Sequence, residues 1–311
     1  MFKQALQLIQ NYNVIIIHRH TNPDGDAIGS QVGLVQLIKH NYAYKTVYIV
    51  GDDPKRYGFV ENSAPNEIGD EAYENALAII LDTSVKSMIS DNRYERAKAT
   101  IRFDHHIYCE TIADVDIVDN TYESCCGLLT DFALQTGLKL NVPAAKALFT
   151  GMVTDSGRFR YDSTNARTFR LAAALIEQNF DTNDIYANLY ADDFSMILLR
   201  AKYVQKIRFT EHNVAYIITT KEELAETPAD EFTVSRGMVG VMSDIRGVDT
   251  WVNYTETDRG VLCELRSKKY NINPIAVKYG GGGHAKASGA TIKDLETAML
   301  MLKDLDELNS D

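Results

Sequence analysis

The stretch from Val14 to Asp26 reads VIIIHRHTNPDGD, a short apolar run that ends in a polar turn. Such a run, bounded by turn-forming residues, is typical of a buried strand. Similar apolar runs lie at 46–50, 76–81 and 100–103, and helical patterns cover 27–40, 124–135, 143–154 and 166–178. Strands that alternate with helices in this way predict an α/β fold with a parallel sheet.

The sequence changes character after a helical stretch at 192–209, DDFSMILLRAKYVQKIRF. Beyond it, strand patterns lie at 214–219, 250–254 and 261–265, followed by a glycine run at 280–283 and a helix at 295–308. This order is typical of a smaller α+β domain with a mixed or antiparallel sheet. We therefore expect a first domain at 1–190, a linker helix at 191–210 and a second domain at 211–311.

The bulk composition limits the partners and the location. The chain of 311 residues carries 43 acidic and 32 basic residues, and its net charge of -11 disfavours a long nucleic-acid duplex as a partner. The amino-terminal stretch lacks the order of a signal peptide, and no apolar run reaches about 18 residues, so we expect no membrane association. The four cysteines form no CxxC pair and are expected to be reduced thiols in the cytoplasm. The oligomeric state is left open, with a homodimer as one option.

Four short blocks concentrate aspartate and histidine at the ends of apolar segments. Three of them follow predicted strands, and one follows a predicted helix. They are centred on His20-Thr21-Asn22-Pro23-Asp24-Gly25-Asp26, on Asp82, on Asp104-His105-His106 and on Asp155. Each block taken alone also fits a plain structural role, such as a helix cap, a surface histidine or a helix stop.

The blocks become informative when they are taken together. Because ligands of an open parallel sheet bind outside the carboxyl ends of its strands, we expect the blocks to converge. They supply six candidate metal ligands, none of them a thiolate: His20, Asp24, Asp26, Asp82, His105 and Asp155. One metal ion of five or six coordination could use them all, but two ions that share a bridging carboxylate use them more naturally. Mixed imidazole and carboxylate ligands favour Mn²⁺, Fe²⁺ or Zn²⁺ over Ca²⁺, and two Mn²⁺ ions are our first choice.

In order and spacing, the blocks resemble the DHH phosphoesterase superfamily, named for the sequence that stands here as Asp104-His105-His106. The segment GGGGHAKASG at 280–289 is similar to the companion DHHA1 domain. The resemblance covers nearly the whole chain and is closest to the bacterial oligoribonuclease and pAp phosphatase branch.

The resemblance implies a role for each residue of the blocks. The first metal ion would be held by His20, Asp24 and Asp82. The second would be held by Asp26, Asp82, His105 and Asp155, with Asp82 as the bridge. Catalytic roles would fall to Asp82, Asp104, His105 and His106, of which Asp104 would orient a histidine and His106 would face the scissile phosphate.

The glycine run has two interpretations. Four consecutive glycines alone favour a flexible linker, yet here they lead into a compact polar segment, and glycine amides can approach an anion closely. The resemblance implies a grip on the terminal phosphate of a nucleotide by Arg266, Ser267, Gly281, Gly282, Gly283 and His284. Lys268 and Lys269 follow Arg266-Ser267 and make this a local basic cluster in an acidic chain.

The implied activity is hydrolysis of phosphate esters by a water molecule that two metal ions activate. The expected substrates are short RNA oligonucleotides, giving 5′-mononucleotides, and 3′-phosphoadenosine 5′-phosphate (pAp), giving AMP and phosphate. One alternative is a phosphodiesterase for linear dinucleotides such as pApA or pGpG. A family II-like inorganic pyrophosphatase would lack the glycine-rich segment, and a non-catalytic nucleotide sensor should have lost a metal ligand.

Overall fold

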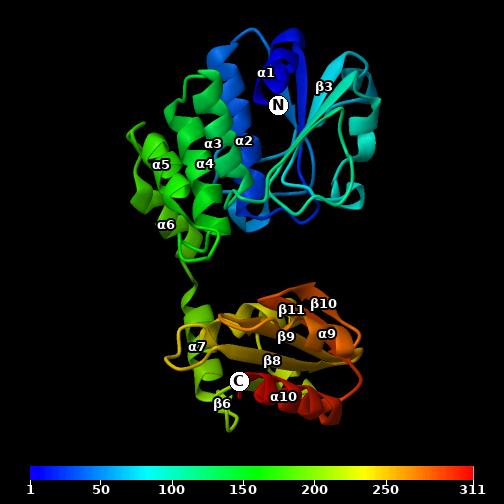
Figure 1. Ribbon diagram of the computed structural model, residues 1–311, viewed down its shortest axis with the longest axis vertical. Coiled ribbons are helices and arrows are strands. Elements are labelled where there is room, and N and C mark those ends of the chain that lie inside the picture. Colours follow the sequence, from blue (N-terminus) through cyan, green and yellow to red (C-terminus); the bar gives the residue numbers. More distant parts are fainter. Residues whose placement is uncertain (311) are drawn as a thin grey trace. The chain divides into compact units, whose positions relative to one another are not determined.

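The computed structural model describes residues 1–310, and the chain forms two compact units, Met1–Ala191 and a second that starts at Asp192. Each unit has its own sheet and its own hydrophobic core (Figure 1). The first unit contains the four blocks of aspartate and histidine, and the second contains the glycine run.

The first unit is built on a five-stranded parallel sheet with the order β2-β1-β3-β4-β5. Its strands are β1 (Val14–His18), β2 (Thr46–Ile49), β3 (Ala76–Leu81), β4 (Ala99–Asp104) and β5 (Val115–Val118). The parallel sheet confirms the fold class predicted from the sequence. Strand β5 was not predicted, because its four residues, VDIV, include an aspartate and are flanked by Asp114 and Asp119.

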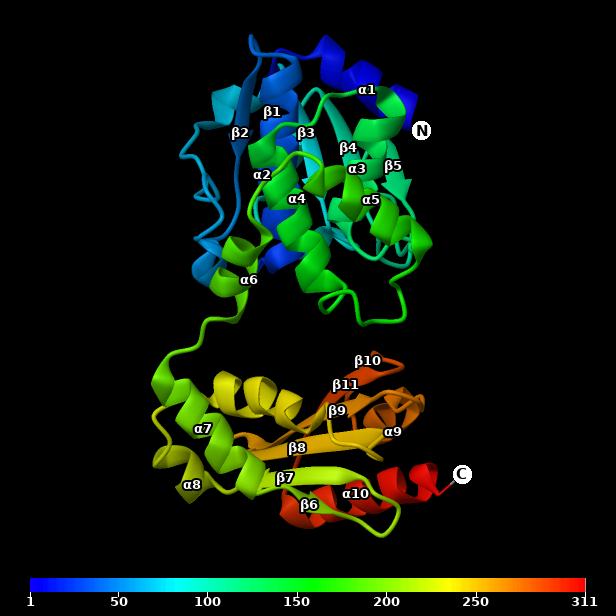
Figure 2. The same ribbon diagram turned by 90° about the vertical axis from the view of Figure 1, so that its left-hand side faces the viewer.

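Helices cover one face of this sheet. Side chains alternate along β1, so that Ile15 and Ile17 join the large core under the helices while Ile16 packs with Tyr73 on the opposite face. Helices α2, α3 and α4 lie side by side over the strands (Figure 2). The helices of the unit are α1 (Phe2–Asn11), α2 (Gly25–Asn41), α3 (Cys125–Thr136), α4 (Val142–Asp155), α5 (Ala166–Ile176) and α6 (Thr182–Tyr190).

Helices α2 and α4 approach each other closely through glycine. A Cβ atom on Gly29 of α2 would lie 2.6 Å from the carbonyl oxygen of Ala147 and 2.9 Å from the amide nitrogen of Gly151, both on α4. A Cβ atom on Gly25, at the start of α2, would lie 2.5 Å from side-chain atoms of Thr154, near the end of α4. The close approach brings the first turn of α2 beside the last turn of α4, where two of the predicted ligands lie.

The second unit contains a six-stranded mixed sheet with the order β10-β11-β9-β8-β7-β6. Only β7 and β8 pair in parallel, and the other neighbours are antiparallel. The strands are β6 (Arg208–Phe209), β7 (Ala215–Thr219), β8 (Thr250–Thr257), β9 (Gly260–Ser267), β10 (Gly282–His284) and β11 (Ala287–Ile292). Strands β10 and β11 were not predicted, because their sequences GGH and ASGATI are rich in glycine and small residues.

Each face of the second sheet has its own core. On one face, Tyr254 and Leu265 pack against Met301 and Leu305 of the closing helix. On the other face, Leu199 and Tyr203 of α7 are buried with residues of the sheet, so this helix packs into the second unit. The helices of the unit are α7 (Phe194–Gln205), α8 (Lys221–Ala225), α9 (Asn273–Lys278) and α10 (Leu295–Asn309).

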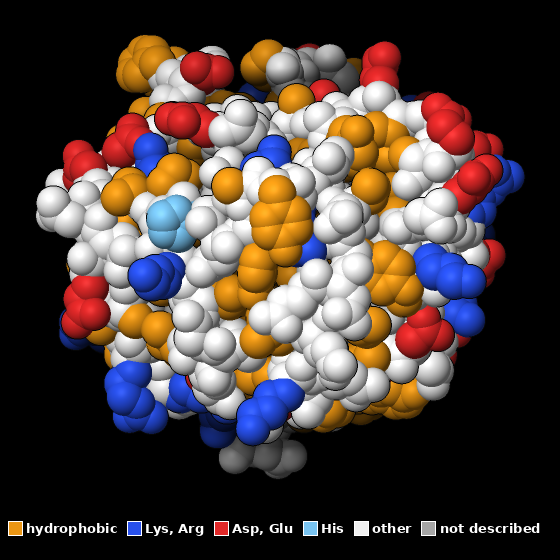
Figure 3. Space-filling view, turned by 90° about the horizontal axis from the view of Figure 1, so that it is seen from above, with side chains coloured by type: hydrophobic (Ala, Val, Ile, Leu, Met, Phe, Trp, Pro, Cys, Tyr) orange, Lys and Arg blue, Asp and Glu red, His pale blue; other side chains and the backbone are white. Residues whose placement is uncertain are grey.

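The surface carries charge of both signs. On the face drawn in Figure 3, acidic and basic side chains surround a centre of apolar and uncharged groups, so the acidic excess is not gathered there. Among the helices of residues 1–310, none combines the length and the apolar character that a bilayer span requires.

The contact between α2 and α4 predicts the effect of Gly29→Ala. The added methyl group meets backbone atoms of α4 that cannot move independently. We expect a net loss of about 1–2 kcal/mol in the free energy of unfolding, measured by urea denaturation, because overpacking outweighs the helix propensity that alanine adds. Gly58→Ala is the control, since the atom nearest its added carbon is Lys55 O at 3.3 Å. A Gly29→Ala protein as stable as the wild type would contradict the close contact.

Candidate metal centre and phosphate site

The turn after β1 presents its two aspartates in different directions. Asp24 is the N-cap of α2, and its Oδ1 accepts hydrogen bonds from the amides of Asp26 (2.9 Å) and Ala27 (3.0 Å). The helix cap in the first block is therefore Asp24 and not Asp26. Asp26 lies in the first turn of α2, and its buried carboxylate faces α3.

The amino terminus of α3 holds the carboxylate of Asp26. Asp26 Oδ2 accepts a hydrogen bond from the amide of Cys125 at 2.6 Å, and Asp26 Oδ1 accepts one from the amide of Cys126 at 2.9 Å. Amides at a helix amino terminus have no partner within the helix and stabilise negative charge. The orientation of Asp26 is therefore fixed by backbone groups that do not depend on the side chains of α3.

Asp82 lies between two histidines at the carboxyl end of β3. Its amide donates to Phe103 O at 2.9 Å, and its φ of 53° is left-handed, an uncommon conformation for a non-glycine residue. Asp82 Oδ2 is 3.6 Å from His20 Nε2, and Asp82 Oδ1 is 3.4 Å from His105 Nε2. One oxygen of this buried carboxylate thus faces each histidine.

The third and fourth blocks complete the cluster around Asp82. His105 Nε2 lies 3.4 Å from Asp155 Oδ2 and 3.8 Å from Asp26 Oδ2. His106 Nδ1 lies 2.7 Å from Asp104 Oδ1, the geometry of an Nδ1–H that donates to a carboxylate. The structure thus brings all the predicted residues of the first unit into one region at the carboxyl edge of the sheet.

The donor atoms fit divalent metal ions. Three triplets each offer ligand atoms within 4.8 Å of one another: His20, Asp24 and Asp82; Asp26, His105 and Asp155; and Asp82, His105 and His106. Within residues 1–310, Asp82 Oδ1 is buried and has no hydrogen-bond partner, which suits an oxygen that binds a cation. Cys125 and Cys126 adjoin the cluster, but burial raises the pKa of both thiols well above the usual value, so thiolate ligation is disfavoured.

The electrostatics of the metal-free cluster favour bound protons. Burial alone would lower the pKa of His20 and of His105, but the neighbouring aspartates raise the pKa of each to about 11. Burial raises the pKa of Asp155 to about 7. Burial also opposes ionisation of Asp82, yet its contacts with His105 and His20 hold the pKa of that carboxyl well below its usual range. A metal ion must therefore displace protons from the imidazoles.

The phosphate-site candidates of the second unit lie on neighbouring strands. Arg266 of β9 pairs with Ala287 of β11, and Gly283 of β10 pairs with Ser288 of β11. Arg266 Nη2 donates to Glu264 Oε2 at 3.1 Å, and Ser267 Oγ accepts a hydrogen bond from the amide of Tyr270 at 2.8 Å. Strand register thus brings Arg266-Ser267 together with the carboxyl half of the glycine run.

The glycine run is not wholly a loop. Gly282, Gly283 and His284 form β10, and Gly283 has a φ of 128°, which favours glycine. A Cβ atom on Gly283 would lie 2.7 Å from Ala287 O, so the pairing with β11 also requires a residue without a side chain. Glycine at this position is needed for strand pairing, and the linker interpretation does not explain it.

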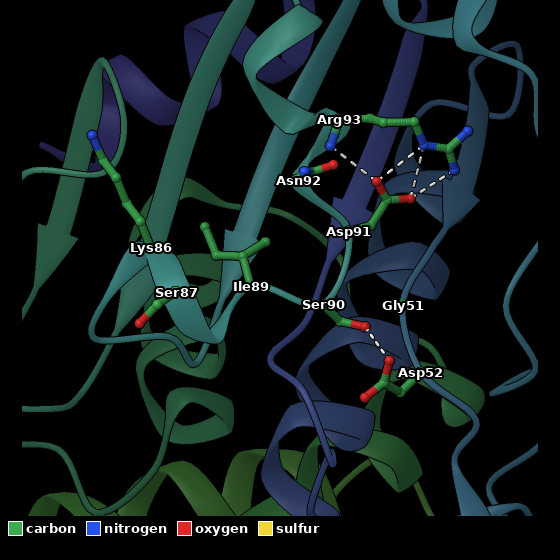
Figure 4. A pocket seen from close by; sticks show the side chains of 9 residues that line it. All are labelled: Gly51, Asp52, Lys86, Ser87, Ile89, Ser90, Asp91, Asn92 and Arg93. Carbon is green, nitrogen blue, oxygen red and sulfur yellow. Dashed lines mark hydrogen bonds and ion pairs between the residues drawn. The ribbon is translucent and has the colours of Figure 1, made fainter.

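A cavity of about 620 Å³ lies between the residues that follow β2 and the segment at 86–93, and no candidate ligand lines it (Figure 4). Two acidic side chains of this cavity are engaged by neighbours, since Asp91 pairs with Arg93 and Asp52 accepts from Ser90 Oγ at 2.5 Å. Asp52 Oδ2 also accepts from the amide of Asn22 at 2.9 Å. The contacts of Asp52 support the turn that carries His20, and the metal centre lies elsewhere.

The sequence pattern identified the charged ligands but not the groups that hold them. The role of the α3 amides could not be predicted from the sequence, because every residue except proline provides a backbone N–H. Arg102 stands in the third block, yet no role was predicted for it. An arginine inside an otherwise apolar strand was the available signal, because buried charge requires partners.

The raised pKa values predict that Mn²⁺ binding releases protons. At pH 7, metal-free His20 and His105 are protonated because their pKa values are near 11. Metal ligation requires neutral imidazole, so at least about two protons should leave per protein and affinity should weaken as the pH falls. Titration calorimetry in two buffers of different ionisation enthalpy measures the release. His212→Ala, which removes an exposed histidine of the second unit, is the control, and a binding heat that does not depend on the buffer would contradict the prediction.

Two family models match the chain, one in each of its two units. Residues 14–152 match the DHH family, N-terminal domain, and residues 227–311 match the DHHA1 domain. A bifunctional oligoribonuclease and PAP phosphatase from Bacillus subtilis is 32% identical over 99% of this chain and 98% of its own length. A probable enzyme of the same name from Streptococcus mutans is 34% identical over 93% of each chain.

A solved structure shares the fold. The crystal structure of an exopolyphosphatase-related protein from Bacteroides fragilis covers 100% of this chain and 97% of its own, with a TM-score of 0.88 at 24% identity. The sequence relatives extend over nearly the full length and exceed 30% identity. This chain therefore belongs to the DHH phosphoesterase family and carries the companion DHHA1 domain.

Proposed function

We propose that the chain is a metal-dependent hydrolase that degrades short oligoribonucleotides to 5′-mononucleotides and converts pAp to AMP and phosphate. The observation that carries this proposal is the position of Asp82, which turns one carboxylate oxygen toward each of two ligand clusters. Relatives named bifunctional oligoribonuclease and PAP phosphatase support the choice of substrates.

Two metal ions, in our proposal Mn²⁺, would be shared among the six ligands as follows. The first ion would be held by His20, Asp24 and Asp82, and the second by Asp26, Asp82, His105 and Asp155. When bound, such ions lower the pKa of a water nucleophile and neutralise charge on the phosphoryl oxygens. The buried and hydrogen-bonded setting of Asp26 keeps its carboxylate in one orientation for this task.

Asp104 and His106 would act on the substrate side of the cluster. Asp104 is fully buried and accepts from His106 Nδ1, which fixes the tautomer and the ring orientation of the histidine. The contact with Asp104 raises the pKa of His106, so a positive charge is available to a phosphoryl oxygen. His106 is the most exposed of the three histidines of the cluster, with 42% of its side chain accessible.

The second unit would bind the terminal phosphate of the substrate. Arg266 and Ser267 form the end of β9, with Lys268 and Lys269 exposed directly after them. Gly282, Gly283 and His284 form β10, two strands away in the same sheet, and Gly281 directly precedes this strand. We infer that residues 1–190 perform catalysis, that 191–210 link the domains and that 211–311 bind phosphate, in a reduced, cytoplasmic enzyme whose four cysteines are free.

A substrate panel tests the proposed function. Protein with Mn²⁺ is offered pAp, a five-nucleotide RNA, linear pApA, pyrophosphate and long single-stranded DNA, and products are separated by chromatography. We expect AMP from pAp and 5′-mononucleotides from the RNA. Cleavage of pyrophosphate alone would overturn the proposal, and cleavage of pApA alone would establish the dinucleotide alternative.

Asp82→Ala is the matched control for this panel. The variant removes both oxygens that face the two clusters. Turnover should fall by at least about 10³-fold if the carboxylate is shared by both ions, since metal binding and nucleophile activation are lost together. Activity near the wild-type level would exclude the bridging role and would also expose a contaminating nuclease.

Arg266→Ala tests the phosphate site separately. A charge-assisted hydrogen bond contributes about 1.5–3 kcal/mol, so KM for pAp should rise by about tenfold or more while kcat changes little. The control is Arg259→Ala, which removes an exposed arginine of the same unit that pairs with Glu231. An unchanged KM in Arg266→Ala would remove this residue from the phosphate site.

A further inference from the structure

Arg102 is a fully buried cation in the middle of β4. Its neighbours Ile101 and Phe103 join the core beneath the helices, so the side chain of Arg102 lies on the opposite face of the sheet. Within residues 1–310, Arg19 and Arg102 are the largest side chains that are fully buried. Burying a guanidinium carries a large desolvation cost, so its position requires several partners of fixed geometry.

The partners of Arg102 come from three separate segments. Arg102 Nη1 donates to Thr83 O at 3.4 Å and to Ser84 O at 3.3 Å, the two carbonyls that directly follow Asp82. Arg102 Nη2 donates to Glu110 O at 2.9 Å, in the loop that follows His106. Arg102 Nε donates to Asp116 Oδ1 of β5 at 2.9 Å and so also fixes the guanidinium group.

These contacts connect the two loops that carry the central residues of the metal centre. Asp82 has a left-handed backbone, and the carbonyls after it are directed to the guanidinium. In addition, Arg102 Nη1 lies 4.0 Å from Asp104 Oδ2, a buried oxygen with no hydrogen-bond partner in residues 1–310. The guanidinium is therefore also close to the carboxylate that orients His106.

We propose that Arg102 is a positioning residue that fixes the Asp82 loop relative to the His105 and His106 loop, so that the metal ligands of both meet. Lysine cannot replace it, because a single ammonium group lacks the planar fork that reaches carbonyls of two loops and a carboxylate. The effect on the reaction rests on the proposed function. The effect on metal binding rests on the proposed metal centre alone and does not depend on the substrate.

The test compares Arg102→Met and Arg102→Lys with the wild type. Mn²⁺ affinity is measured by titration calorimetry without substrate, kcat and KM are measured with pAp, and unfolding is followed by temperature. We expect Mn²⁺ affinity to fall by about 10- to 100-fold in both variants, the range typical of groups that orient metal ligands. The value of kcat should fall with it at fixed Mn²⁺, while KM for pAp stays within about twofold, because Arg102 does not contact substrate.

Arg93→Met is the matched control. Arg93 is an ion-paired arginine of the same unit, which contacts Asp91 and Ile68 O and none of the ligand loops. Its loss should lower the unfolding temperature but leave Mn²⁺ affinity and kcat unchanged. A folded Arg102→Met protein with the same behaviour as Arg93→Met would show a purely structural role and would overturn the proposal.

Arg102→Lys keeps the test decisive if Arg102→Met does not fold. A folded Arg102→Lys protein with wild-type Mn²⁺ affinity and kcat would refute the positioning role, whereas weaker binding with unchanged KM would support it. If the wild type cleaves neither pAp nor RNA, the proposed function fails. The calorimetric comparison then still decides the role of Arg102.

Discussion

The metal centre depends on one buried carboxylate, Asp82, placed between His20 and His105. The parallel sheet explains why the three groups meet, because β1, β3 and β4 are adjacent and all end at the same edge. The backbone of Asp82 leaves the extended conformation directly after β3, and its two oxygens face His20 and His105. A left-handed aspartate costs conformational energy, and the packed surroundings of the strand end hold it in that state.

The other half of the ligand set depends on helix packing. Asp26 and Asp155 lie on the first turn of α2 and the last residue of α4, so their separation is set by how closely these helices approach. The contact of Gly29 with the backbone of α4 permits that approach, and the amides of α3 then turn Asp26 toward His105. Replacing Gly29 with a larger residue would move Asp26 and Asp155 apart without changing either ligand.

The sequence predicted the parts of the site that follow from local pattern. Asp82 and Asp104-His105-His106 stand at the ends of apolar runs, and strand ends in a parallel sheet converge whatever the remaining sequence is. Asp155 was harder to place, since its position depends on the packing of α4, which no local pattern encodes. In the second unit, β10 and β11 were missed because glycine is depleted in strands, and only the pairing with β9 explains its presence there.

Bound protons limit the repulsion within this acidic cluster. Four carboxyl groups lie around His20 and His105, and like charges in a buried site would repel. The raised pKa values of the two histidines supply positive charge, and burial keeps the pKa of Asp155 near 7, which further limits the negative charge. Because the histidine pKa values are raised above 6.5, this stabilisation is complete below about pH 6.5, declines above it and is lost by about pH 11. Metal ions would therefore compete with protons for the same carboxylates and imidazoles.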